Sequence, residues 1–259
     1  DRKEWDQKCY DAIREEGEKL QRRKTWLEDT VCEKEDFLSW ARGEGVELIP
    51  GDLMTICSIK NWETKLLHKH KGRIVFRGDS AKDQDGAPAV YQELSANPST
   101  IQGINSNIAY GCIPGNVTMT ADAPQAYTQA TLKSKKQTWV SVPKELWPKH
   151  WHAEGWRKPM CRLDKALYGH PESGGHWEKH LEEAIFAIGG QAVPNHKSSY
   201  WIGELKRRLT VYVDDLLLSG PVGAHAEFWQ LLSKGPKPID IDEPELLDKF
   251  LNREHTPMQ

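Results

Sequence analysis

Paired cysteines are absent from this sequence. Its 259 residues contain five cysteines at wide spacings, and no C-x-x-C motif occurs. An odd number of widely separated cysteines argues against a zinc site and against a disulfide framework. Disulfides form in oxidising compartments, so the pattern fits a reducing one, and we expect an intracellular protein.

Long apolar runs are absent as well. No stretch approaches the ~20 consecutive apolar residues that a membrane-spanning helix needs. The first residues, DRKEWDQKCY, form neither a signal peptide nor a transit peptide. We therefore expect no membrane partner. The chain also lacks an initial methionine, and we expect it to be a piece of a longer protein.

An excess of basic residues is lacking too, because the net charge is −3. A protein that grips phosphates is often basic overall, so this balance argues mildly against nucleic-acid binding. The sum hides a local exception between residues 60 and 77, where Glu63 is the only acid. The basic side chains of this stretch are Lys60, Lys65, Lys69, Lys71, Arg73 and Arg77, with His68 and His70 beside them.

The apolar periodicity predicts a mixture of helices and strands. Apolar residues at helical spacing predict helices over 5–24, within 90–113, over 175–188 and over 224–234. Alternating or short apolar runs predict strands over 52–60, 73–77, 116–122 and 138–142. We expect the region from 25 to about 50 to be irregular. Strand pairs mixed with helices favour an α+β fold over a parallel doubly wound sheet.

Two adjacent acids interrupt an apolar segment at residues 208–219, RLTVYVDDLLLS. This pattern predicts a β-hairpin with Asp214 and Asp215 at its turn. An exposed turn, where aspartate is common, is one interpretation. A divalent-metal site is the other, because hard cations such as Mg²⁺ take carboxylate oxygens as ligands. Asp122, which ends the strand at 116–122, is a candidate third ligand, although its position in the sequence does not place it near the pair.

Five motifs in order carry a family resemblance. YVDD (212–215) resembles the catalytic hairpin of reverse transcriptases, and TADAPQAYTQATL (120–132) resembles the copia-type pattern around its first aspartate. The others are KGRIVFRGD (71–79), TWVSVPKEL (138–146) and CRLDKALYGHPESGGHW (161–177). The chain is thus similar to the reverse transcriptase domain of copia-type LTR retrotransposons over about residues 5–255.

The resemblance implies a fold and an activity. The fold is α+β, the palm and fingers of a right-hand polymerase with an antiparallel palm sheet and a thumb that is largely absent. We expect a single domain over 1–259, mainly fingers over about 1–115 and mainly palm with fingers elements over about 116–255. The implied activity is RNA-directed DNA polymerisation, in which dNTPs are added to a primer 3′-end by nucleotidyl transfer.

The resemblance also implies partners and a compartment. The substrates are an RNA template, a DNA primer and dNTPs. RNase H and integrase domains are expected elsewhere on the polyprotein of the transposable element, which leads to DNA integration. The expected location is a cytoplasmic particle or the nucleus.

By resemblance, Asp122, Asp214 and Asp215 are the catalytic acids and hold two Mg²⁺ ions, for which Mn²⁺ can substitute. Tyr212 and Val213 support the hairpin. The implied nucleotide-binding residues are Lys71, Arg73, Arg77, Tyr127, Tyr168 and Gly169. From the residues alone, the alternative for Tyr127 is an ordinary core tyrosine. The alternative for the basic strand is a solvated strand, and the Tyr-Gly pair alone indicates a turn.

The chain also departs from the family pattern. Residues 170–174 are His-Pro-Glu-Ser-Gly, where the family commonly has Lys-Gln-Ala-Pro after the Tyr-Gly pair. The alternatives to an active polymerase are a folded but inactive retroelement remnant, a nucleic-acid-binding module with structural acids, and a metal-dependent nuclease. Binding that depends on salt but not on Mg²⁺ would indicate the binding module.

Overall fold

The computed structural model describes residues 2–92 and 96–256. The chain divides into two compact units, Asp1–Leu94 with Ala130–His176, and Ser95–Gln129 with Trp177–Gln259. Each unit is built from two separate segments of the chain, so neither corresponds to one half of the sequence. The assignment of residues 1–259 to one domain, with a change from one part to the other near residue 115, stays a prediction. The mixed α+β composition is confirmed.

The first unit is built on a five-stranded mixed sheet. Its strands are β1 (Trp26–Glu33), β2 (Leu48–Lys60), β3 (Lys69–Phe76), β5 (Gln137–Ser141) and β6 (Pro159–Leu163). They lie in the order β1-β6-β5-β2-β3, with β2 and β5 parallel and the other pairs antiparallel. The helices are α1 (Arg2–Arg22), α2 (Lys34–Gly43) and α5 (Lys149–Glu154), with 3₁₀ turns η1 (Lys65–Leu67), η2 (Gly78–Ser80) and η3 (Lys144–Leu146).

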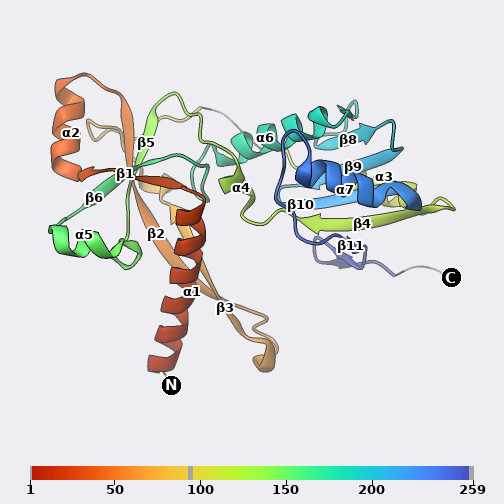
Figure 1. Cartoon of the computed structure of the whole chain (residues 1–259), viewed down its shortest axis with the longest axis horizontal. Coiled ribbons are helices and arrows are strands. Elements are labelled where there is room, and N and C mark those ends of the chain that lie inside the picture. The colour runs from red at the N-terminus through yellow and green to blue at the C-terminus, as the bar shows by residue number, and fades with distance from the viewer. Residues whose placement is uncertain (1, 93–95, 257–259) are drawn as a thin grey trace. The chain divides into compact units, whose positions relative to one another are not determined.

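The helix and strand at the N-terminal side of this unit pack closely. Figure 1 shows α1 running alongside the long β2–β3 hairpin. Gly72 permits this approach, because a Cβ there would collide with the Ala12 carbonyl oxygen. Ile74 and Phe76 are buried while Arg73 is exposed, as the predicted alternation of this strand requires.

The prediction of an irregular region over 25–50 is wrong. Residues Trp26–Glu33 form β1 and Lys34–Gly43 form α2. β1 pairs with β6, and its register shifts between Leu27 and Cys32. This irregular pairing leaves partly buried side chains along most of the strand, so the sequence shows no clean alternation. The pairing with a distant strand stabilises β1 where local pattern does not predict it.

The second unit is built on a six-stranded sheet, of which every recorded strand pair is antiparallel. The order is β11-β4-β10-β9-β8-β7. The strands are β4 (Asn116–Asp122), β7 (Gly190–Ala192), β8 (Ser199–Ile202), β9 (Arg207–Tyr212), β10 (Asp215–Pro221) and β11 (Glu245–Leu246), and a small hairpin is formed by β12 (Lys249–Phe250) and β13 (Arg253–Glu254). The helices are α3 (Ile101–Gly111), α4 (Ala126–Gln129), α6 (Ser173–Ala187) and α7 (His225–Lys234), with the 3₁₀ turn η4 (Val222–Ala224).

The leucine run of β10 explains how this sheet is covered. Leu216 and Leu218 belong to the main core with residues of α6 and α7, whereas Leu217 packs with Ile104 of α3. Both faces of the strand are therefore buried, which accounts for an uninterrupted apolar sequence. The predicted apolar stripe of the helix at 175–188 is confirmed, since Trp177, Leu181, Ala184, Ile185 and Ile188 all contact this core.

The helices and the cysteines can be compared with the expectations about membrane spans and disulfides. Within residues 2–92 and 96–256, no helix is both long enough and apolar enough to span a membrane. All five cysteines are free.

Candidate functional site

The hairpin at residues 207–221 closes with a two-residue turn. Tyr212 pairs with Asp215, which leaves Val213 and Asp214 as the two central residues. Val213 has a φ of 58°, a left-handed conformation that is strained for a β-branched side chain. The Trp177 indole donates a hydrogen bond of 2.7 Å to the Val213 carbonyl oxygen, so a buried residue of α6 holds the strained turn in place. Strain of this kind persists where the surroundings impose it and is frequent at functional sites.

Strand pairing brings the third aspartate to the same end of the sheet. Asp122 is the register partner of Asp215 in the antiparallel β4–β10 pair. The Ala123 amide donates a hydrogen bond of 2.8 Å to the Asp214 carbonyl oxygen. The Asp242 amide does the same to the Asp122 carbonyl oxygen, also at 2.8 Å. We name Asp122, Asp214 and Asp215 the acidic corner.

The acidic corner carries negative charge that the fold does not neutralise. The pKa of Asp215 is raised from 3.8 to about 7, chiefly by burial and also by the carboxylates of Asp214 and Asp122. A side-chain hydrogen bond with Asp122 acts in the same direction. A partly buried carboxylate that faces like charges is costly unless a proton or cation joins it.

Tyr127 lies beside this corner. It belongs to α4, which follows β4 after a turn at Gln125 with a φ of 51°. Its side chain is half-buried and packs against the main core of the second unit. Burial raises the pKa of Tyr127, and the nearby Asp214 carboxylate contributes. The ring is thus both a core residue and a neighbour of the acidic corner.

The acidic corner is not a ready-made metal centre. Among the described residues, no three His, Cys, Asp or Glu side chains form a group that could hold a metal ion. The donor chemistry nevertheless fits a hard divalent cation, because all three side chains are carboxylates and Asp215 lies against two like charges. Cation binding would require the side chains of the corner to turn toward a common point.

The basic residues predicted to bind nucleotide lie in the first unit. Lys71 and Arg73 are in β3, opposite Ser58 and Ile56 of β2. Arg77 follows the strand, where its amide donates a hydrogen bond of 3.0 Å to the Asp52 carbonyl oxygen and its guanidinium lies 3.6 Å from the Asp79 carboxylate. Arg73 and Arg77 are exposed, so both are accessible to an anionic ligand.

Tyr168 and Gly169 lie against the end of the same strand. The Phe76 amide donates a hydrogen bond of 2.7 Å to the Tyr168 carbonyl oxygen. Gly169 has a φ of 86°, and a Cβ there would collide with the Phe76 carbonyl oxygen. Only glycine fits this position without strain. The structure therefore brings this Tyr-Gly turn to the end of the basic strand, a contact that the sequence did not predict.

The residues that follow this turn form a buried polar cluster, which sequence reasoning missed. Glu172 is 2% exposed. Its carboxylate accepts hydrogen bonds from the Gln92 amide at 2.8 Å and the Ser134 hydroxyl at 2.5 Å, and lies 3.4 Å from His176 Nε2. His170 accepts from the Glu172 amide at Nδ1 and contacts the Thr138 hydroxyl at Nε2, 3.1 Å away. The HPESG sequence that departs from the family pattern thus forms a local hydrogen-bond network.

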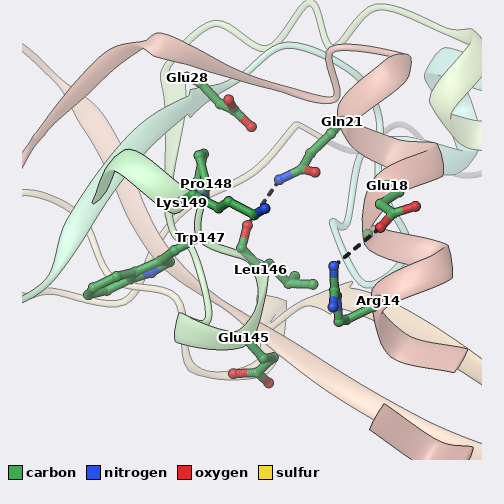
Figure 2. A pocket seen from close by; sticks show the side chains of 10 residues that line it. Arg14, Glu18, Gln21, Glu28, Glu145, Leu146, Trp147, Pro148 and Lys149 are labelled. Carbon is green, nitrogen blue, oxygen red and sulfur yellow. Dashed lines mark hydrogen bonds and ion pairs between the residues drawn. The ribbon is translucent and has the colours of Figure 1, made fainter. Parts of the chain in front are cut away.

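Two pockets were not anticipated either. A pocket of about 230 Å³ in the first unit lies between α1, β1 and η3 (Figure 2), where Gln21 donates to the Leu146 carbonyl oxygen at 3.0 Å. Its lining includes the acids Glu18, Glu28 and Glu145 and the bases Arg14 and Lys149, so charges of both signs are present. In the second unit, a more apolar pocket of about 400 Å³ lies between α3, Tyr212 and the β12–β13 hairpin.

Comparisons with known proteins give a likeness to solved structures only. No protein-family model and no curated protein matches the sequence. Among solved structures, the chain is similar to telomerase from Candida albicans in complex with the TWJ fragment of telomeric RNA, with a TM-score of 0.42 and 10% sequence identity. The match covers 85% of this chain and 48% of that chain, so this chain spans about half the length of that structure. A likeness of this size carries no functional conclusion for this chain.

Proposed function

We propose that this chain is the reverse transcriptase domain of a copia-type retroelement and catalyses RNA-directed DNA synthesis. The observation that supports the proposal is the acidic corner. A strained two-residue turn carries Asp214 and Asp215 to the end of an antiparallel sheet, in register with Asp122 of the neighbouring strand. In this proposal the second unit is the palm and the first unit contributes the fingers. RNase H and integrase domains belong to the same polyprotein.

In the proposed site, Asp122, Asp214 and Asp215 hold two Mg²⁺ or Mn²⁺ ions. When bound, such ions stabilise the attacking and leaving oxygens of an in-line displacement. The cations would also offset the repulsion that raises the pKa of Asp215. The Trp177 hydrogen bond keeps Val213 in its strained conformation, and with it the two aspartates at the turn.

The nucleotide contacts are proposed from the family resemblance, and residue chemistry supports them. Tyr127, beside Asp214, is proposed to pack under the sugar of the incoming nucleotide and to exclude a 2′-hydroxyl. Arg73, Arg77 and Lys71 are proposed to bind the triphosphate, because guanidinium groups match phosphate oxygens. Tyr168 and Gly169, against the end of β3, are proposed to line the nucleotide pocket.

A folded but inactive remnant, or a binding module with structural acids, is the second candidate. It is favoured by the lack of a ready three-ligand group within the described residues and by the net charge of −3. A binding module predicts nucleic-acid affinity that falls with salt and does not respond to Mg²⁺.

The test is dNTP incorporation on a primed RNA template with Mg²⁺ or Mn²⁺. The wild-type chain is compared with Asp214→Asn and with Asp242→Asn as a matched control. Asp242 is exposed, and its amide rather than its carboxylate contacts Asp122. We expect incorporation by the wild type and the control and none by Asp214→Asn. Equal incorporation by all three proteins would contradict the proposed site. No incorporation by a well-folded wild-type chain would favour the second candidate.

A further inference from the structure

The tip of the β2–β3 hairpin presents an aromatic ring to solvent. Trp62 is 69% exposed. It stacks on His68, with the ring centroids 5.4 Å apart and the planes inclined by 8°. A solvent-facing tryptophan in a flat stack is a surface on which another planar ring can stack, whereas a core tryptophan is enclosed on both faces.

Hydrogen bonds within the tip hold this ring in place. His68 Nε2 lies 2.9 Å from the Trp62 carbonyl oxygen, and the Asn61 side chain donates to the Leu67 carbonyl oxygen at 3.2 Å. The Thr64 amide bonds to the Asn61 carbonyl oxygen at 3.0 Å. The exposed ring is therefore pre-positioned, which lowers the entropy that a partner must overcome on binding.

The strands that carry the tip place positive charges in direct opposition. Lys60 and Lys69 are cross-strand partners, and both are exposed. Like charges at such a position are destabilising, and Glu63 is the only acid between residues 53 and 78. Glu15 of α1 is near Lys69, but its carboxylate is 2.7 Å from Lys19. A polyanion along the hairpin would relieve this repulsion.

We propose that the β2–β3 hairpin tip binds single-stranded nucleic acid, with a base stacked on Trp62 and flanking phosphates at Lys60 and Lys69. An exposed aromatic ring beside lysines is the arrangement by which single strands are held without sequence readout. An anionic membrane is the competing partner, since Leu66 and Leu67 are also exposed. The stacked geometry and the polar residues Asn61, Glu63 and Thr64 favour the nucleic acid.

The test is fluorescence anisotropy with a fluorescein-labelled 12-nucleotide single strand, in EDTA and without dNTPs. These conditions make the result independent of polymerase activity and of the acidic corner. The Trp62→Ala variant is compared with Trp40→Ala as the matched control. Trp40 is 53% exposed in the same unit, but the first turn of its helix carries the acids Glu35 and Asp36, whereas two lysines face each other at the hairpin tip.

We expect Trp62→Ala to weaken binding by about 5- to 100-fold, Trp62→Phe to restore most of it, and Trp40→Ala to change the affinity by less than about twofold. Lys60→Gln with Lys69→Gln should reduce the slope of log K against log salt by about 1.4, or about 0.7 for each phosphate contact. Glu63→Gln should strengthen binding. A duplex of the same sequence should bind less tightly, because its bases are already stacked.

The following results would overturn the proposal. The first is no binding of the single strand by the wild-type chain, or equal losses in Trp62→Ala and Trp40→Ala. The second is equal affinity for single strand and duplex. The third is a Trp62→Ala defect seen only with phosphatidylcholine–phosphatidylserine vesicles, which would assign the tip to a membrane. Because Trp62 is largely exposed, we expect Trp62→Ala to keep the wild-type circular dichroism spectrum.

Discussion

Glu172 in the first unit and Asp215 in the second are acids within folded structure, and their surroundings are opposite. Glu172 faces donors, namely the Gln92 amide, the Ser134 hydroxyl and His176. Asp215 faces the carboxylates of Asp122 and Asp214. The carboxylate of Glu172 is satisfied by the fold, whereas that of Asp215 has no positively charged partner among residues 2–92 and 96–256.

The pKa values of the two acids move in opposite directions for this reason. Burial by itself would raise the pKa of Glu172, but the hydrogen bonds from Ser134 and Gln92, together with smaller contributions from His170 and His176, outweigh it and lower the pKa. For Asp215, burial and the neighbouring charges act together and raise the pKa. A satisfied acid indicates a structural role, and an acid held against other acids indicates a site for a cation or proton. The comparison predicts opposite responses when either acid is neutralised.

The largest effect is expected for Glu172→Ala. Removing this carboxylate leaves the Ser134 hydroxyl and the Gln92 amide without their acceptor in a buried place, at a cost of about 3 kcal/mol in the free energy of unfolding. Denaturant unfolding measures it. The matched control is Glu15→Ala, whose exposed pair with Lys19 on α1 should contribute less than about 0.5 kcal/mol. Equal losses of unfolding free energy in both variants would contradict a structural role for Glu172.

A smaller effect is expected from acid, through His170. Burial lowers the pKa of His170 from 6.5 to about 4, although Glu172 acts in the other direction. The folded state therefore holds a neutral ring that the unfolded state protonates first, so stability is full above pH 6.5 and is lost as the pH falls toward 4. Between pH 7.5 and 5 we expect the contribution of His170 to the free energy of unfolding to fall by about 2 kcal/mol.

The measurement compares unfolding of the wild type and His170→Gln at both pH values. The variant should lose about 2 kcal/mol less than the wild type between them. Exposed His150 supplies the control, because His150→Gln should follow the wild-type pH dependence. A His170→Gln chain with the wild-type pH dependence would contradict a neutral buried ring.

Neutralising Asp215 should have the opposite sign. In metal-free buffer at pH 8, Asp215→Asn removes one of three like charges and should stabilise the chain by about 1–2 kcal/mol, less than the pKa shift alone implies because the side chain is partly exposed. Chemical denaturation measures this gain. Asp79→Asn, at an exposed pair with Arg77, is the control and should not stabilise. Destabilisation by Asp215→Asn would mean that this carboxylate is satisfied after all.

The smallest effect separates the hydrogen bond of Trp177 from its packing. Trp177 and Trp229 are buried tryptophans of one core, 2% and 5% exposed. Trp177 donates to Val213, whereas the Trp229 indole has no hydrogen-bond partner within the described part of the chain. Trp177→Phe should therefore cost about 1 kcal/mol more than Trp229→Phe. Equal unfolding free energies for the two variants would show that the turn does not depend on this bond.

Much of the second unit was predictable because its patterns are local. The strand over 116–122 has the predicted bounds, and the acids of the hairpin lie at its turn and the adjoining start of β10. The apolar stripe from Trp177 to Ile188 forms the core. The proximity of Asp122 to Asp215 was not predictable from spacing, because it depends on the pairing of β4 with β10. The family resemblance gave that expectation.

The first unit was less predictable because its features depend on distant partners. β1 pairs irregularly with β6, so its pattern is weak. Glu172 is structural only because Gln92 and Ser134 approach it from other segments. An acid in a Pro-Glu-Ser-Gly sequence has no local pattern that indicates burial. A tryptophan between Asn61 and Glu63 likewise has no pattern that indicates stacking.

The most direct test of the acidic corner is unfolding of the wild type and Asp215→Asn at pH 8 over a Mn²⁺ titration. Without metal, the variant should be the more stable protein. A ligand that binds only the folded state adds stability as its concentration passes its dissociation constant. The free energy of unfolding of the wild type should therefore rise more than that of the variant as the Mn²⁺ concentration increases. Equal gains by both proteins, or no gain by either, would contradict the assignment of Asp122, Asp214 and Asp215 as a divalent-cation site.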